Sequence, residues 1–341
     1  METSPQGGMN ARTVLGALAL VVLGLLTWEL RWVLLVLFGA IVLAVALDVP
    51  MTLLRRLTPL NRPAALVTVL VGLVLIGGLL IELLLPELLD QIKQLSELLP
   101  ELLQRLDQLT RQIPWLPDVE RSLSDGSLWN KLQPLGAQLL GFAGGAASIT
   151  VQLLLMVLLA VLLALDPRAH QKLLVAITPR FYRPSMQGLL GSARAALGGW
   201  LAGMTLSAVS VFVMTWAGLA LLGIPLALLS ALVCGLLTFV PTIGPTAATL
   251  LPMAVALSVS PTAVIKVLVL RLALQNIEAF LITPVLLRQT VNLLPTVALM
   301  SQLCLGALLG LPGVLLALPL VVVLQVVCQQ VVVRDVMDRW S

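Results

Sequence analysis

The chain has 341 residues, of which 59% are hydrophobic and only 11% are charged, and its mean hydropathy is +1.06. Because soluble domains carry roughly 25% charged residues, this composition excludes an ordinary soluble protein and indicates an all-α polytopic membrane protein. A bilayer core needs about 20 apolar residues per helix, so the length allows about six to eight spans and no large soluble domain.

Residues 1–85 are predicted to hold the first three spans, which would act as a scaffold. We expect the apolar stretches "TVLGALALVVLGLLT" and "VLLVLFGAIVLAVAL" to form two short spans joined by a tight hairpin at "WELRW". The next loop carries Arg55, Arg56 and Arg62 against Asp48, and short basic loops stay in the cytoplasm. The N-terminus should then also be cytoplasmic, in a multi-pass protein of the bacterial cytoplasmic (inner) membrane.

Residues 86–138 are predicted to be an extracytoplasmic helical insertion. The segment contains five Lys or Arg and eight Asp or Glu, and an acidic balance fits the outer side of the membrane. Apolar residues recur at alternating intervals of four and three, which is the pattern of a seam that packs against another helix. The seam could pack on residues 128–140 of the same chain, or it could join protomers of a homo-oligomer. Pro100 predicts a kink in either case. The seam consists of Leu88, Ile92, Leu95, Leu99, Leu102, Leu106, Leu109 and Ile113.

Residues 139–194 are predicted to hold a fourth span, from about Leu139 to Leu165, and a basic linker. The linker is richer in Arg and Lys than in acids, so we expect it to be cytoplasmic and partly an interfacial helix.

Residues 195–333 differ from the earlier spans because two long apolar segments are interrupted by Gly and Pro. Breaks at membrane depth are tolerated only where the freed backbone groups are buried in protein or line a wet cavity, and a pair of broken segments indicates a transporter's binding site. The alternative is that Gly and Pro are simply common in membrane helices. The first break falls at Pro241, Gly244 and Pro245, and the second at Gly306, Gly310, Pro312 and Gly313.

The stretch "LRLALQNIEAFLITP", residues 270–284, places charges between the two breaks. A charge at the centre of a span costs about 2.5–3.5 kcal/mol, so this helix should not face lipid all round. Arg271, Gln275 and Glu278 are spaced four and three apart and share one face, whereas Asn276 and Lys266 point elsewhere. Arg271 and Glu278 are about 10 Å apart along the axis, which is too far for a direct pair. They could form a structural polar clamp or bind a substrate or ion.

Other chemistry has little support in the sequence. No phosphate-binding G-x-x-x-x-G-K-[ST] loop is present, and His170 is the only histidine, so we expect no enzyme, no cofactor and no metal site. The three cysteines lie separately in apolar runs, where a small hydrophobe is the usual role. The basic linker is typical of a membrane-flanking segment rather than of nucleic-acid binding.

The motifs "FVPTIGPTAATLLP", "QNIEAFLITPVLLRQTVNLLPTVAL" and "GALLGLPGVLLALPLVVVL" resemble, in order and spacing, those of the autoinducer-2 exporter (AI-2E) family, also called PerM-like permeases. The resemblance implies a secondary carrier with about seven or eight membrane segments. Some members are linked to autoinducer-2 export and others to sodium or lithium extrusion against protons. The family's motif positions fall on Gly244 and Pro245, Gln275, Glu278 and Pro284, Asn292 and Pro295, and Gly306, Gly310, Gly313 and Pro319.

We therefore expect residues 195–333 to form a mobile transport unit with two broken hairpins, followed by a cytoplasmic tail at 334–341. The broken segments could be re-entrant hairpins or two complete spans each. Substrate would bind where Thr242 to Pro245 and Gly306 to Gly313 approach Gln275, Asn276 and Glu278, with Arg271 beside them. The leading hypothesis is gradient-driven export of a small polar metabolite, such as autoinducer-2. The alternatives are a Na⁺(Li⁺)/H⁺ antiporter and, in another class, a non-transporting oligomeric membrane scaffold.

Overall fold

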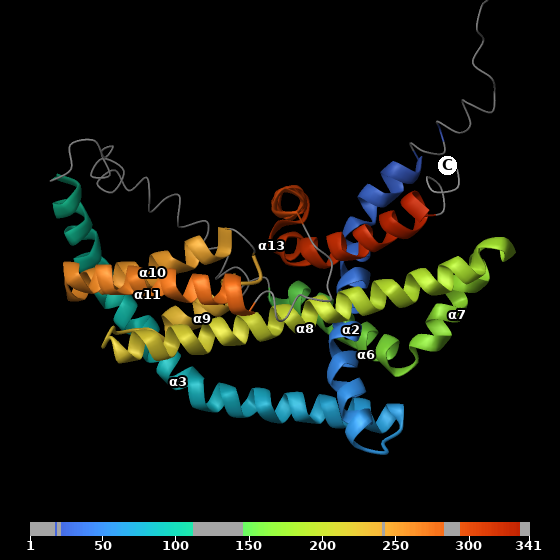
Figure 1. Cartoon of the computed structure of the whole chain (residues 1–341), viewed down its shortest axis with the longest axis horizontal. Coiled ribbons are helices and arrows are strands. Elements are labelled where there is room, and N and C mark those ends of the chain that lie inside the picture. The colour runs from blue at the N-terminus through green and yellow to red at the C-terminus, as the bar shows by residue number, and fades with distance from the viewer. Residues whose placement is uncertain (1–17, 19–21, 112–145, 241–242, 283–293, 335–341) are drawn as a thin grey trace, which may run out of the picture.

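The computed structural model describes residues 18, 22–111, 146–240, 243–282 and 294–334, and every element in these ranges is a helix (Figure 1). In chain order they are α2 (Arg31–Leu57), α3 (Arg62–Arg111), α6 (Ala146–Leu165), α7 (Pro167–Ile177), the 3₁₀ turn η1 (Arg180–Tyr182), α8 (Arg183–Leu221), α9 (Ala227–Leu237), α10 (Ile243–Val259), α11 (Pro261–Ile277), the π-helix η2 (Glu278–Ile282), α13 (Pro295–Val327) and the π-helix η3 (Cys328–Arg334).

The long helix α8 connects two groups of helices, and Figure 1 shows it running along the length of the molecule. At one end α2 packs on α6 and on the start of α3, and this core is built on small side chains, among them Ala40, Ala44, Ala160 and Ala164. Small residues let membrane helices approach closely. At the other end α8 packs with α9, α10 and α11 around Leu219. A third cluster joins α2, α8 and α13.

Four described helical stretches are long and apolar enough to cross a membrane: Arg31–Leu57, Arg62–Leu98, Arg180–Leu221 and Pro295–Val333. A fifth is added if the bent pair α6–α7 counts as one span. Length and composition thus support an all-helical integral membrane protein. The expected seven or eight segments are not reached among the described residues, partly because most of the first predicted span lies outside them, and that number stays a prediction.

The tight hairpin expected at "WELRW" is wrong. Residues 22–29 are helical and α2 begins at Arg31. The amide of Leu30 donates to the carbonyl of Leu26, and the amide of Leu34 donates to that of Leu30, both at 2.9 Å. This i to i−4 pattern carries one helix through the joint, and Arg31 stacks on Trp28 at 4.6 Å instead of turning the chain. The cytoplasmic N-terminus was inferred from that hairpin and stays a prediction.

A separate helix, α7, forms where the interfacial helix was expected, and it is bent from α6 by 87°. Its place at the membrane interface stays a prediction. Asp166 caps α7, because its carboxylate accepts a hydrogen bond from the amide of Ala169 at 3.1 Å, and Pro167 occupies the first helical position. Asp at the N-cap followed by Pro is a strong helix start, so the sequence stops α6 and begins a new helix within one residue.

Near this bend, one buried carboxylate joins three helices. Asp48 of α2 pairs with Arg62 of α3 at 2.7 Å and with Arg194 of α8. Arg62 also donates through Nε to the carbonyl of Ala164, the penultimate residue of α6, at 2.9 Å. Two guanidinium groups around one carboxylate leave one net positive charge, and together they fix the relative positions of α2, α3, α6 and α8.

The predicted insertion begins as a continuation of the third span, because α3 runs without a break from Arg62 to Arg111. Figure 1 shows this helix changing direction along its length. Among the seam residues, Leu88 and Leu95 pack against the α8–α11 core, and Leu102 is buried. The seam is therefore covered within the same chain at these positions, by α9 and α10. Residues 128–140 lie outside the described residues, so packing on them and joining of protomers both stay predictions.

Two polar side chains of α3 form hydrogen bonds with the start of α9 and the end of α10, which is the end of this helix pair away from the break; we call it the open end. The amide of Leu229 in the first turn of α9 donates to Gln91 Oε1 at 2.8 Å. Arg105 Nη1 donates to the carbonyl of Leu257 near the end of α10 at 2.9 Å. Helix ends leave such backbone groups without partners in their own helix. α3 thus supplies the caps that the ends of α9 and α10 lack.

Both predicted breaks are present. The helix α9 ends at Leu237 and α10 begins at Ile243. The thiol of Cys234 donates to the carbonyl of Ala248 at 3.3 Å, which shows that the two helices fold back on each other. A Cβ on Gly244 would lie 1.9 Å from the carbonyl oxygen of Leu237, so only glycine allows this approach.

The second break lies inside α13 at Gly310, where φ is 64° and ψ is −150°. A Cβ on Gly313 would lie 2.1 Å from the carbonyl oxygen of Leu305, and one on Gly306 would lie 2.8 Å from the side chain of Val314. Residues eight apart in a straight helix are separated by about 12 Å, so the chain turns sharply here.

Candidate functional site

The candidate site lies where α8, α10 and α11 meet beside the first break, and it is centred on Arg271. Ser260 caps α11 by accepting a hydrogen bond from the amide of Ala263 at 3.1 Å, and Pro261 follows it. This start fixes the register of α11, which turns Arg271 inward. Its side chain is 5% exposed, although Arg is almost never fully buried without a partner.

The guanidinium of Arg271 is held by neutral oxygen atoms from two neighbouring helices. Nη1 donates to Thr215 Oγ1 of α8 at 3.1 Å, and Nε donates to Thr249 Oγ1 of α10 at 3.2 Å. Nη2 donates to the carbonyl of Pro245 at 3.4 Å. No carboxylate in the described part of the chain lies within ion-pair distance of this group. Arg271 is therefore a buried cation at the helix break with no counter-charge among the described residues.

Glu278 lies two turns further along the same face and is half-buried. Its Oε1 accepts a hydrogen bond from Ser207 Oγ of α8 at 2.9 Å. The α-helix changes into the π-helix η2 at this residue, and π-helical turns occur frequently at functional sites. Since Arg271 contacts Thr215 and Glu278 contacts Ser207, α11 and α8 run antiparallel, and the two charges have separate partners on α8.

The predicted face of α11 is confirmed. Arg271 is buried, Gln275 and Glu278 are half-buried, and Asn276 and Lys266 are exposed. Asn276 donates to the carbonyl of Leu272 in its own helix at 2.8 Å and does not join the site. The absence of a direct Arg271–Glu278 pair also agrees with the spacing.

The structure brings only part of the predicted site together. Pro245 contacts Arg271, and Gly244 lies in the first turn of the same helix, whereas Thr242 lies outside the described residues. The second break is elsewhere, because α13 packs mainly on α8 and α2 rather than on α10 or α11. The residues of that break, Gly306, Gly310 and Gly313, are thus not placed against Arg271 or Glu278 by any described contact.

Sequence reasoning missed the hydroxyl groups of Ser207, Thr215 and Thr249, and also Gln302 of α13. Gln302 is 4% exposed, and neither its amide nitrogen nor its amide oxygen has a hydrogen-bond partner within the described residues. It follows Ala298, which packs against α8 in the core shared with α2, by one turn. Gln302 could have been found from the sequence, because it is a lone amide in an apolar helix. The three hydroxyl residues could not, because single Ser and Thr residues are common in membrane helices.

Nothing in the described ranges forms a metal site, since no three His, Cys, Asp or Glu residues cluster there. The chemistry that the geometry offers is hydrogen bonding and charge: a guanidinium with unused N–H groups, a carboxylate and several hydroxyls in a low-dielectric setting. Such groups can hydrogen-bond to a small polar solute or an ion.

Comparison with known proteins places the chain among transport proteins. A curated relative from Bacillus subtilis (strain 168), named "Putative transport protein YrrI", is 26% identical over 161 residues, which is 47% of this chain and 46% of that protein. The match thus spans about half the length of the relative. The family model described as "AI-2E family transporter" matches residues 15–333. The chain therefore belongs to the AI-2E family of transporters.

Proposed function

We propose that this protein is a gradient-driven secondary transporter that exports a small polar metabolite across the bacterial cytoplasmic membrane. The observation that carries the proposal is the buried Arg271 at the α9–α10 break, whose partners within the described ranges are all neutral oxygen atoms. Autoinducer-2 or a similar solute is the substrate class suggested by the family description.

The unused donors of Arg271 support a polar substrate. A guanidinium has five N–H groups, and hydrogen bonds to Thr215, Thr249 and Pro245 use three of them. A solute carrying hydroxyl, carbonyl or carboxylate oxygens would supply the missing acceptors. Hydrogen bonds to a charged donor contribute about 1.5–3 kcal/mol each, so two of them would give useful affinity and still permit release.

The dimensions of the first broken hairpin support a site near the middle of the membrane. At about 1.5 Å per residue, the 11 residues of α9 extend about 16 Å, roughly half of a 30 Å bilayer core. Arg271 lies ten residues from the start of α11 and is thus at a similar depth. We infer that α9 and α10 enter the membrane and return, with their tip beside Arg271. Broken helices of this kind expose the backbone groups that bind solutes in transporters.

A second candidate function is Na⁺(Li⁺)/H⁺ antiport, and Glu278 is the observation that favours it. This carboxylate is half-buried, has one hydroxyl partner among the described residues, and stands at the start of a π-helix. A carboxylate in a membrane helix that faces neighbouring helices is a candidate proton or cation carrier. Arg271, two turns away, would repel a bound cation, so we rank antiport second.

Transport measurements with purified protein in liposomes and with inverted vesicles would test both functions. Wild type, Arg271→Gln and Glu278→Gln are compared for uptake of labelled autoinducer-2 and for dye-reported proton movement after addition of Na⁺ or Li⁺. Lys266→Gln, which removes an exposed cation from the same helix, is the matched control.

Metabolite export predicts labelled uptake that is lost in Arg271→Gln and kept in Lys266→Gln. A cation-triggered proton signal that is lost in Glu278→Gln, without metabolite uptake, would replace export by antiport. If the folded wild-type protein shows neither labelled uptake nor a proton signal, the result would contradict transport and favour the non-transporting scaffold.

A further inference from the structure

A cavity of about 310 Å³ lies far from Arg271, in the corner between α2, the α6–α7 bend and α8. Its size is at the lower end of ligand pockets, which span about 300–1,000 Å³. Apolar side chains make up most of the wall. The polar groups that line it are Arg62, Arg194, His170 and Gln171.

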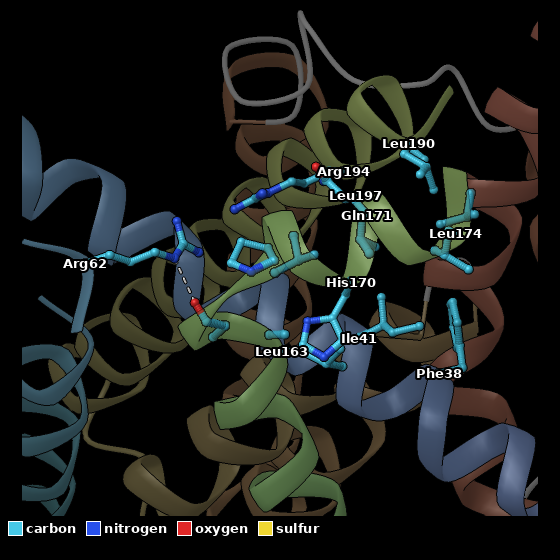
Figure 2. A pocket seen from close by; sticks show the side chains of 16 residues that line it. Phe38, Ile41, Arg62, Leu163, His170, Gln171, Leu174, Leu190, Arg194 and Leu197 are labelled. Atoms are coloured by element: carbon cyan, nitrogen blue, oxygen red, sulfur yellow. Dashed lines mark hydrogen bonds between the residues drawn. The ribbon is translucent and has the colours of Figure 1, made fainter. Parts of the chain in front are cut away.

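The cavity has a charged side and an apolar side. Figure 2 shows Arg62 and Arg194 close together at one side, and Phe38, Leu174 and Leu190 at the other. A ligand that fits this wall has an anionic group at one end and a hydrocarbon part at the other. A small inorganic anion would leave the apolar side unfilled.

The charge balance at the polar side favours an anion. Asp48 behind the cavity neutralises only one of the two arginines. Arg62 donates one hydrogen bond to Asp48 and one to the carbonyl of Ala164. Three of its five N–H groups remain to bind a ligand. Arginine binds phosphate with two parallel hydrogen bonds, which adds both strength and geometric selectivity.

The helices around the cavity have features that fit a membrane lipid with an anionic headgroup. The exposed Arg168 and Lys172 follow the lining residues Pro167 and Gln171 on α7 and add positive charge to this helix. α7 begins directly where the apolar helix α6 ends. Half of the side chain of Leu174 is exposed at this place. Basic pockets between membrane helices at the cytoplasmic side bind anionic lipid headgroups.

We propose that this cavity is a binding site for one anionic phospholipid, with the phosphate on Arg62 and Arg194 and an acyl chain along Phe38, Leu174 and Leu190. The lipid would connect α2, α7 and α8 at the same place as the Asp48 ion pairs. The site is separate from the candidate transport site, since none of its lining residues belongs to α10 or α11.

Thermal unfolding of the purified full-length protein in detergent tests the proposal, with phosphatidylglycerol, phosphatidylethanolamine or inorganic phosphate added. Phosphatidylglycerol should raise the Tm of the wild type, and neither of the other two additions should do so. Arg194→Gln should weaken the apparent affinity by about tenfold or more, because a charged hydrogen-bonding partner is lost. Native mass spectrometry should show one retained phosphatidylglycerol on the wild type.

A pair of matched variants separates the cavity from a general lipid effect. Ala193→Leu fills the cavity, whereas Ala195→Leu makes the same change on the exposed side of α8. The first should lose the response to phosphatidylglycerol and the second should keep it. If Ala193→Leu does not fold, Leu190→Trp fills the apolar side instead. An equal response to phosphatidylethanolamine, a shift produced by phosphate alone, or a full response in a folded cavity-filled variant would each overturn the proposal.

Discussion

Replacing Arg271 by Met tests whether this buried cation is a structural clamp or a binding group. The side chain makes three interhelical hydrogen bonds of 3.1, 3.2 and 3.4 Å. Interhelical hydrogen bonds in membrane proteins contribute about 0.6–1.7 kcal/mol each, so three contribute about 2–5 kcal/mol. Against this stands the cost of a charge in the membrane centre, about 2.5–3.5 kcal/mol on insertion scales.

The two terms nearly cancel, because no carboxylate among the described residues offsets the charge. Removing the charge also leaves Thr249 paired, since its hydroxyl already donates to the carbonyl of Pro245 at 2.8 Å. We therefore expect Arg271→Met to change the free energy of unfolding by no more than about 2 kcal/mol and to abolish substrate uptake. A clamp would show the opposite: a large loss of stability, with uptake per folded molecule unchanged.

Titration with a denaturing detergent in mixed micelles gives the unfolding free energy, and proteoliposome uptake gives the activity of the same preparation. Lys266→Met is the control, because it removes a cation from the same helix at an exposed position. A destabilisation above about 4 kcal/mol in Arg271→Met, with normal uptake by the remaining folded protein, would refute the assignment of Arg271 as a binding group.

Three further changes have expected outcomes. Gly244→Ala should abolish folded protein in size-exclusion chromatography, because its Cβ would lie 1.9 Å from the Leu237 carbonyl oxygen, whereas Gly72→Ala on α3, with no atom within 4 Å, should behave as wild type. Asp48→Asn should lower the Tm by the equivalent of about 3 kcal/mol, since it breaks a partly buried ion pair and leaves two arginines without a carboxylate; an unchanged Tm would contradict this role. Gln91→Leu should speed amide hydrogen exchange at the start of α9 and cost about 1–3 kcal/mol by leaving a buried backbone N–H unpaired; unchanged exchange there would show that another group caps α9.

The features predicted correctly from the sequence are those that depend on local information. The inward face of α11 follows from the spacing of Arg271, Gln275 and Glu278 along one helix. The two breaks follow from Gly and Pro, because these residues limit the backbone whatever surrounds them. The end of the fourth span at Leu165 was also predicted, and Asp166 and Pro167 explain it, because they begin a new helix at the adjacent turn.

The errors concern contacts between distant segments and the direction of the chain at joints. The stretch "WELRW" has aromatic and charged residues typical of a membrane interface, but it contains neither Gly nor Pro, so nothing in the backbone prevents the helix from continuing through Leu30. The seam of α3 showed correctly that Leu88 and Leu95 need a partner. Its spacing alone did not name α9 and α10 as partners, because a heptad pattern shows which face is apolar but not which helix covers it. Packing on residues 128–140 stays a prediction.

The α9–α10 hairpin shows the same division within a single element. At its tip, Gly244 and Pro245 predict the turn. The nearby Arg271 can be recognised in the sequence because a charge in an apolar helix is rare. At its open end, the caps come from Gln91 and Arg105, which in the sequence look like ordinary polar residues of a solvated helix. Their role depends on α3 lying beside the hairpin, more than a hundred residues away in the sequence. A rare residue in an unusual place can be recognised from one sequence as a candidate, whereas the packing that positions it needs the fold.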